Sequence, residues 1–126
     1  MRLLLDTHAL LWALGHPGRL PKGVAAALRD PSNDVVVSAV STWEVAIKTA
    51  LGRLAADAAA IVAELRDAGF DELPITVDHT VRLRDLPPHH RDPFDRLLVA
   101  QALVEGLTVV TSDPAFAAYP APRWWG

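Results

Sequence analysis

The sequence contains no cysteine, which excludes disulfides, thiol catalysis and thiolate metal sites. It also lacks a long hydrophobic run, because charged residues interrupt every apolar stretch, so no membrane-spanning helix is predicted. An aspartate at position 6 divides the apolar N-terminus, MRLLLDTHALLWAL, which argues against a signal peptide. We therefore expect a cytoplasmic protein with no membrane partner.

Positive charge is not in excess either. The chain carries 12 basic and 15 acidic residues, which gives a formal net charge of −3. Taken alone, this balance argues against a plain basic surface for nucleic acid. That conclusion depends on what the acidic residues do.

The remaining composition is that of a globular protein, with 51% hydrophobic and 21% charged residues. A chain of 126 residues fits one compact domain, and we expect residues 1–126 to form it.

Short apolar runs bounded by turn residues predict buried strands at 2–5, 35–37 and 107–111, with a weaker fourth strand at 75–77. The segments between them have helical patterns. The alternation of strands with helices predicts an α/β fold with a mainly parallel sheet. The predicted helices are 7–14, 21–29, 41–51, 57–68, 78–86 and 93–105, followed by a short turn at 114–118.

Four acidic residues stand where predicted strands end or predicted helices begin. Asp6 ends the first strand, and Asp113 follows the last one in the sequence TVVTSD. Glu44 and Asp95 lie in the expected first turns of helices 41–51 and 93–105. Because the carboxyl ends of parallel strands share one rim with the adjacent helix starts, we expect all four carboxylates at that rim.

Helix capping is the competing explanation, and for each residue alone it is the better one. Asp6 fits it least well, because a charge at the end of a buried strand costs several kcal/mol unless it is matched. The capping candidates are Ser41 and Glu44 as a capping box in STWE, Asp92 before Pro93 in DPFD, Asp113 before Pro114, and Asp6.

The four acids together are harder to explain by capping. Carboxylates gathered on one rim repel one another, and a bound divalent cation removes that repulsion. Hard oxygen ligands without thiolates favour Mg²⁺, with Mn²⁺ as a substitute. Neutralising four carboxylates would also change the formal net charge from −3 to +1, so an anionic substrate would no longer be repelled.

The chain contains, in this order, the segments LLLDTHALLW, SAVSTWEVAIKTALGRL and LPPHHRDPFDRLLVAQALVEGLTVVTSDPAF. Together they resemble the PIN-domain ribonucleases, and more narrowly the VapC-type toxins of bacterial toxin–antitoxin pairs. The resemblance covers residues 2–125 and is weakest at 52–72. It implies a single PIN-like domain with a parallel sheet of four or five strands flanked by helices.

By this resemblance the catalytic acids are Asp6, Glu44, Asp95 and Asp113. We expect Asp6 and Asp95 to bind Mg²⁺ directly, and Glu44 and Asp113 to bind a second ion or to hold its waters. A metal-activated water would then hydrolyse RNA phosphodiester bonds. The resemblance also implies a homodimer and a small antitoxin partner. The alternative is a non-catalytic PIN-like module that binds RNA or a partner.

Several residues near these acids have open roles. Thr7 and Ser112 are expected to hydrogen-bond metal-bound waters. Lys48 could form an ordinary pair with Glu44 four residues earlier or could contact a substrate phosphate. Arg96 could contact RNA or pair with a neighbouring acid. Other open positions are Asp92, expected as a cap, His89 and His90, expected in a solvated loop, and Trp124 and Trp125, expected to cover a sheet edge or a dimer seam or to stack on bases.

Overall fold

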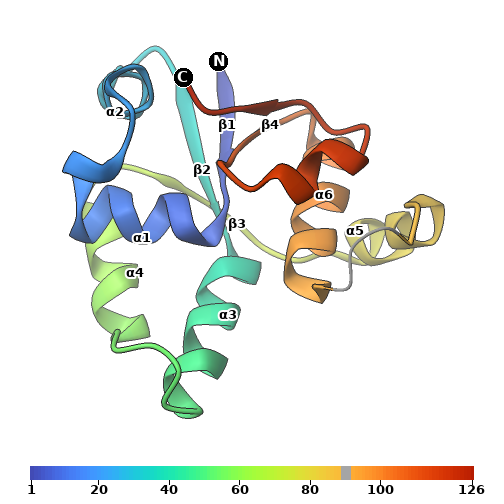
Figure 1. Cartoon of the computed structure of the whole chain (residues 1–126), viewed down its shortest axis with the longest axis horizontal. Helices are drawn as coiled ribbons and strands as arrows, with labels where there is room; N and C mark the ends of the chain where they lie inside the picture. Colours follow the sequence, from blue (N-terminus) through green and yellow to red (C-terminus); the bar gives the residue numbers. More distant parts are fainter. Residues whose placement is uncertain (89–91) are drawn as a thin grey trace.

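The computed structural model of the chain describes residues 1–88 and 92–126 (Figure 1). Its centre is one sheet of five strands in the order β3-β2-β1-β4-β5, in which every pairing is parallel. The strands are β1 (Arg2–Leu5), β2 (Asp34–Ser38), β3 (Asp71–Leu73), β4 (Thr108–Val110) and β5 (Arg123–Trp124). The predicted α/β fold with a parallel sheet is confirmed.

Helices cover both faces of the sheet, as expected when each strand returns through a crossover. Within the described residues, none of them is long and apolar enough to cross a membrane. The helices are α1 (Thr7–Gly15), α2 (Lys22–Arg29), α3 (Ala39–Ala50), α4 (Ala58–Asp67), α5 (Val77–Arg82) and α6 (Pro93–Glu105), with short 3₁₀ turns at Pro17–Arg19, Leu83–Asp85 and Pro114–Ala118.

The side chains of β1 alternate between two hydrophobic cores. Leu4 packs in the core that contains Leu98 of α6. Leu3 and Leu5 point to the opposite face and pack in the core that contains Leu10 of α1. Figure 1 accordingly shows α1 and α4 on one side of the strands and α5 and α6 on the other. This two-sided burial explains why β1 is a continuous apolar run.

The prediction of a strand at 75–77 is wrong. The third strand lies earlier, at Asp71–Leu73, and Val77 begins α5. The reason is a capping box: the Thr76 hydroxyl accepts from the His79 amide, and His79 Nδ1 accepts from the Thr76 amide. This local hydrogen bonding favours a helix start over a further strand. The two-residue strand β5 was not predicted.

The predicted start of the helix at 41–51 is also wrong. Helix α3 begins at Ala39, and its cap is Ser38, whose hydroxyl accepts from the Val40 amide. Ser41 is therefore inside the first turn and buried, and Glu44 is the sixth residue of the helix. The Ser41–Glu44 capping box does not form, so capping does not explain why Glu44 is acidic.

Candidate functional site

The carboxyl ends of the parallel strands place the predicted acids on one rim. Asp6 follows β1 directly, and Asp113 follows the neighbouring strand β4. The Asp6 amide continues the sheet by donating to the Val110 carbonyl at 3.1 Å. We use the name acidic rim for the side chains of Asp6, Glu44, Asp92, Asp95 and Asp113.

Asp6 caps α1 and is buried at the same time. Its Oδ1 accepts from the Ala9 amide at 2.7 Å, and the residue is 5% exposed. Burial raises the pKa of Asp6, and the charge of Asp113 adds to this rise; the Thr111 hydroxyl, the Ala9 amide and His8 act in the opposite direction. Asp6 is therefore both a cap and a carboxylate whose charge is costly where it lies.

Thr111 joins the two acids that follow β1 and β4. Its hydroxyl hydrogen-bonds Asp6 and accepts from the Asp113 amide at 3.0 Å, and Thr111 is 2% exposed. Asp113 also caps the turn after it, through the Ala115 amide at 2.9 Å. Ser112, which we predicted to hydrogen-bond metal-bound water, is exposed, so that role stays a prediction. Strand alternation in TVVTS could have identified Thr111.

Glu44 reaches the same rim from the second turn of α3. It is 5% exposed, and both of its carboxylate oxygens have partners. Thr7 Oγ1 donates to Glu44 Oε1 at 2.6 Å and lies 3.2 Å from Ser41 Oγ. Lys48 Nζ forms an ion pair with Glu44 Oε2. Because Thr7 is the neighbour of Asp6, this hydrogen bond ties Glu44 to the end of β1.

The start of α6 brings two more carboxylates. Asp92 is the cap, as predicted, and its Oδ1 accepts from the Phe94 and Asp95 amides at 2.9 and 3.2 Å. Asp95 stands in the first turn without serving as this cap. The hydrogen bond to Glu44 raises the pKa of Lys48, and the charges of Glu44, Asp92 and Asp95 contribute. The acids of α3 and α6 therefore act on one ammonium group.

The acidic rim thus consists of two linked groups: Asp6 with Asp113, and Glu44 with Asp92 and Asp95 around Lys48. No set of three or more acidic or histidine side chains in the described part of the chain is arranged to hold a metal ion. The donor chemistry nevertheless fits Mg²⁺, because hard carboxylate oxygens predominate. Metal ligation by these residues stays a prediction.

Among the described residues, Arg96 does not form the ion pair with a neighbouring acid that the sequence suggested as one possibility. Its Nη1 donates to the Pro87 carbonyl at 2.7 Å and to the Tyr119 hydroxyl at 3.1 Å, and its guanidinium lies 5.9 Å from the centre of the Tyr119 ring. These contacts fix the start of α6 to the segments around it. A contact between Arg96 and substrate stays a prediction.

The loop histidines and the C-terminal tryptophans were the other residues with open roles. His89 and His90 lie outside the described residues. Trp124 forms the edge strand β5, and the Trp125 ring lies 5.9 Å from the Trp12 ring. Trp124 thus belongs to the strand that pairs with β4 at the edge of the sheet, and Trp125 packs against α1. A contact with a second subunit or with bases stays a prediction.

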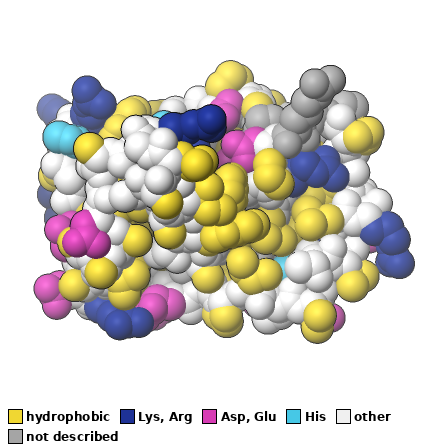
Figure 2. All heavy atoms as spheres, turned by 90° about the horizontal axis from the view of Figure 1, so that it is seen from below, with side chains coloured by type: hydrophobic (Ala, Val, Ile, Leu, Met, Phe, Trp, Pro, Cys, Tyr) yellow, Lys and Arg dark blue, Asp and Glu magenta, His cyan; other side chains and the backbone are white. Residues whose placement is uncertain are grey.

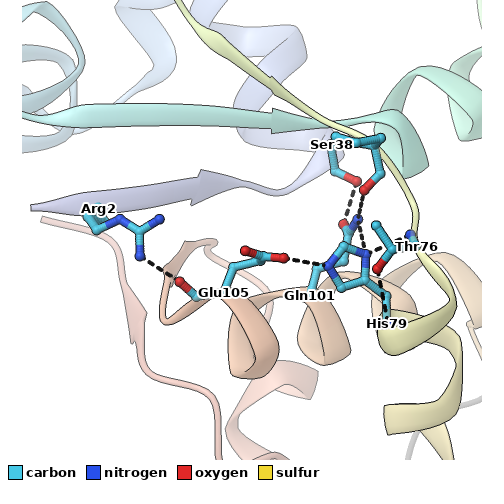
Figure 3. Close-up of polar contacts among 7 residues, drawn as sticks. Arg2, Ser38, Thr76, His79, Gln101 and Glu105 are labelled. Carbon is cyan, nitrogen blue, oxygen red and sulfur yellow. Dashed lines mark hydrogen bonds and ion pairs between the residues drawn. The ribbon is translucent and has the colours of Figure 1, made fainter.

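A second polar cluster was not predicted (Figure 3). His79 is fully buried, and its Nδ1 accepts from the Thr76 amide at 3.0 Å, so the ring proton lies on Nε2 and is donated to Glu105 Oε1 at 2.9 Å. Gln101 lies 3.3 Å from His79 Nδ1 and accepts from the Ser38 hydroxyl. We call Ser38, Gln101, His79 and Glu105 the buried network.

Comparison with protein families matches residues 3–122 to the PIN domain. This chain belongs to the PIN domain family. The match spans every helix and all but the last strand, so it confirms the family inferred from the three sequence segments. No curated protein matches the chain.

Three solved structures have the same fold. VapBC2 from Rickettsia felis, bound to a DNA fragment from its promoter, matches with a TM-score of 0.73 and 16% identity over 98% of this chain and 99% of that one. VapBC-1 from nontypeable Haemophilus influenzae matches with a TM-score of 0.64 and 18% identity, over 94% of this chain and 92% of that one. FitAcB from Neisseria gonorrhoeae matches with a TM-score of 0.61 and 22% identity, over 97% of this chain and 96% of that one.

Proposed function

We propose that this PIN domain is a Mg²⁺-dependent endoribonuclease and the toxin of a toxin–antitoxin pair. The observation that carries the proposal is the acidic rim: carboxylates from four separate segments lie at the carboxyl ends of one parallel sheet. Two of them, Asp6 and Glu44, are only 5% exposed. Burying charges of one sign is unfavourable unless a cation compensates them, and ligand sites in open α/β sheets lie at this rim.

Each residue has a defined part in the proposed reaction. Asp6 and Asp95 bind the ion, while Glu44 and Asp113 bind a second ion or hold metal-bound water. A bound divalent ion supplies an acidified water and stabilises charge on the phosphate. Thr7 keeps Glu44 pointing into the rim through its 2.6 Å hydrogen bond.

Thr111 has the matching part on the other side of the rim, because its hydroxyl fixes the positions of Asp6 and Asp113 relative to each other. Such outer hydrogen bonds orient carboxylate ligands.

The proposed partners are a cognate antitoxin and a second copy of the chain. In support of an antitoxin, the similar structures include VapBC2 and VapBC-1. In support of a protein interface, the face of the molecule in Figure 2 has hydrophobic side chains gathered across its middle, beside acidic and basic ones. Trp43 of α3 is 45% exposed and packs edge-on against Phe94 of α6, with ring centres 4.7 Å apart. Light scattering on the purified chain, alone and co-expressed with the product of an adjacent small reading frame, tests both partners.

The decisive experiment is incubation of the purified protein with total cellular RNA in Mg²⁺ or in EDTA. We expect cleavage in Mg²⁺ alone, with a 5′-phosphate and a 3′-hydroxyl at each cut, because a water is the nucleophile. Ends carrying 2′,3′-cyclic phosphate would contradict the mechanism, since they arise when the RNA's own 2′-hydroxyl attacks. An Asp95→Asn preparation purified in parallel controls for contaminating nuclease.

The second candidate is a PIN module that binds RNA or a protein without cutting. One observation favours it: the described residues contain no metal-binding group as they are arranged, and Glu44 is already paired with Lys48. Intact RNA that stays bound to the protein in Mg²⁺, with no new ends, would support this function over the nuclease.

A further inference from the structure

Lys48 is placed among the carboxylates of the acidic rim. It lies on α3 one turn after Glu44 and forms an ion pair with Glu44 Oε2. The charges of Asp92 and Asp95, at the start of α6, also act on it. Its ammonium therefore sits where two helices bring three carboxylates together.

This ion pair differs from an ordinary pair on a helix surface. The Glu44 side chain is only 6% exposed, and its other oxygen is held by Thr7 at 2.6 Å, whereas the Lys48 side chain is 40% exposed. The carboxylate is thus fixed by the fold, and the lysine is the partner that can leave. Lysine is suited to this role because its ammonium is a compact charge on a flexible stem.

The other basic groups near the rim are used differently. Arg96 turns away to the Pro87 carbonyl and the Tyr119 hydroxyl. His8 acts on Asp6, in the other half of the rim. Lys48 instead forms an ion pair with Glu44 of α3, and the charges of Asp92 and Asp95 at the start of α6 act on it.

We propose that Lys48 is a built-in counter-cation that occupies the acidic rim before metal enters, so that a divalent ion must displace its ammonium from Glu44. This inference rests on the proposed function, because it concerns the same metal site. An ammonium and a divalent cation repel each other at short distance, so an ion that binds Glu44 Oε2 takes the place of the Lys48 ammonium there. The displaced lysine remains near the site, where it can donate to a phosphate oxygen of RNA.

Two consequences follow from the competition. Removing the ammonium should make metal binding tighter, because the ion no longer has to displace a competing charge. It should also leave the metal-free protein less stable, because the buried Glu44 carboxylate then lacks its ion-pair partner. A lysine with a purely structural role would affect the second property and leave the first unchanged.

The test measures Mn²⁺ binding by calorimetry, with thermal unfolding in EDTA as the check on folding. We expect Lys48→Met to bind Mn²⁺ about tenfold more tightly than the wild type, the effect of removing one screened charge–charge interaction. Lys48→Arg, which keeps the charge, should stay close to the wild type. Lys22→Met is the matched control, because Lys22 is the other lysine of the chain and lies exposed on α2.

A second measurement follows Lys48 itself. Reductive ¹³C-methylation labels both lysines and the N-terminus and keeps their charges, and Lys48→Arg identifies the Lys48 signal. Titration with Mg²⁺ should move the Lys48 signal towards that of Lys22, which should not change. Equal or weaker Mn²⁺ binding by Lys48→Met, or a Lys48 signal that stays in place while metal binds, would overturn the inference and leave the nuclease proposal intact. If neither the wild type nor Lys48→Met binds Mn²⁺, the proposed function fails as well.

Discussion

The acidic rim and the buried network are two polar clusters that both involve α6, yet their hydrogen bonding differs. In the buried network every group meets a complementary one: Ser38 donates to Gln101, and His79 accepts at Nδ1 and donates at Nε2. In the acidic rim, by contrast, like charges face one another: Asp113 acts on Asp6, and the carboxylates of Glu44, Asp92 and Asp95 all act on Lys48.

The difference distinguishes a polar cluster that supports the fold from one that can bind a ligand. A polar cluster whose donors and acceptors match needs nothing from outside and can fix the positions of helices. A cluster with a surplus of one charge costs stability and is completed by a ligand of opposite charge. Across the described residues, no buried side-chain nitrogen or oxygen lacks a hydrogen-bond partner. The acidic rim therefore stands out by its charge and not by missing hydrogen bonds.

The largest effect that would sharpen this comparison is on activity. Asp95→Asn should lower Mg²⁺-dependent RNA cleavage by more than the roughly 10- to 100-fold that loss of an outer hydrogen-bonding partner costs, because it removes a proposed ligand. Asp92→Asn is the matched control, since asparagine also caps helices well and should leave most activity. Cleavage rates and circular dichroism of both variants check this. Equal losses of cleavage activity in the two variants would mean that the total negative charge at the start of α6 matters, and not the position of Asp95.

The next effect is on stability. His79→Ala should lower the free energy of unfolding by about 2–4 kcal/mol, because it leaves a cavity and removes the partner of Glu105. Metal binding should be unchanged, since His79 belongs to the buried network. Urea unfolding of this variant, beside exposed His16→Ala as control, measures the loss. A variant as stable as the wild type would show that the network does not hold α5 against α6.

Ser38→Ala should have a smaller effect. Ser38 caps α3 through the Val40 amide and also donates to Gln101, so we expect a loss of about 1–2 kcal/mol. Thr42→Ala removes a hydroxyl that bonds the Ala39 carbonyl within the same helix, and it should cost less. Thermal unfolding of the pair tests the difference. A Thr42→Ala variant that is the less stable of the two would contradict the cap assignment.

The smallest expected effect is a gain in stability, from Asp6→Asn. Burial raises the pKa of Asp6, so the folded protein binds this proton more tightly than the unfolded chain does. The contribution of Asp6 to stability therefore falls as pH rises from the usual pKa of 3.8 through the raised value. Asp6→Asn can keep the cap on Ala9 and should be more stable than the wild type at neutral pH in EDTA, yet inactive.

Thermal unfolding of Asp6→Asn and the wild type across pH checks this, and the gain should disappear below the usual pKa of aspartate. A variant that is less stable than the wild type at pH 7 would show that the Asp6 charge stabilises the fold.

The sequence predicted best where structure depends on neighbouring residues. The run 2–5 is a strand in the structure, and Asp92 with Pro93 starts α6 as expected. The start of α3 was misplaced because two serines lie near it, and the choice of Ser38 depends on Gln101, 63 positions away in the sequence. The strand β5 was missed because two residues carry no periodicity, and it exists only through its pairing with β4.

The candidate site was likewise predicted only in part from the sequence. The order of strands and helices indicated a shared rim for Asp6, Glu44, Asp95 and Asp113, and the family motifs added their proposed roles. Tertiary contacts revealed the rest: Thr111 between two acids, the action of Asp92 and Asp95 on Lys48, and a buried histidine. Each of these depends on where a side chain points after packing.

By itself, the sequence determined the alternation of strands and helices, the absence of thiol chemistry and the acids at the ends of the elements, because composition, apolar periodicity and helix caps act over a few residues. Only the tertiary structure decided that the acids at the start of α6 act on Lys48, that Ser38 caps α3 while donating to Gln101, and that His79 meets Glu105. Those outcomes require groups far apart in the chain to meet in a buried place, where an unmatched charge or hydrogen bond is costly.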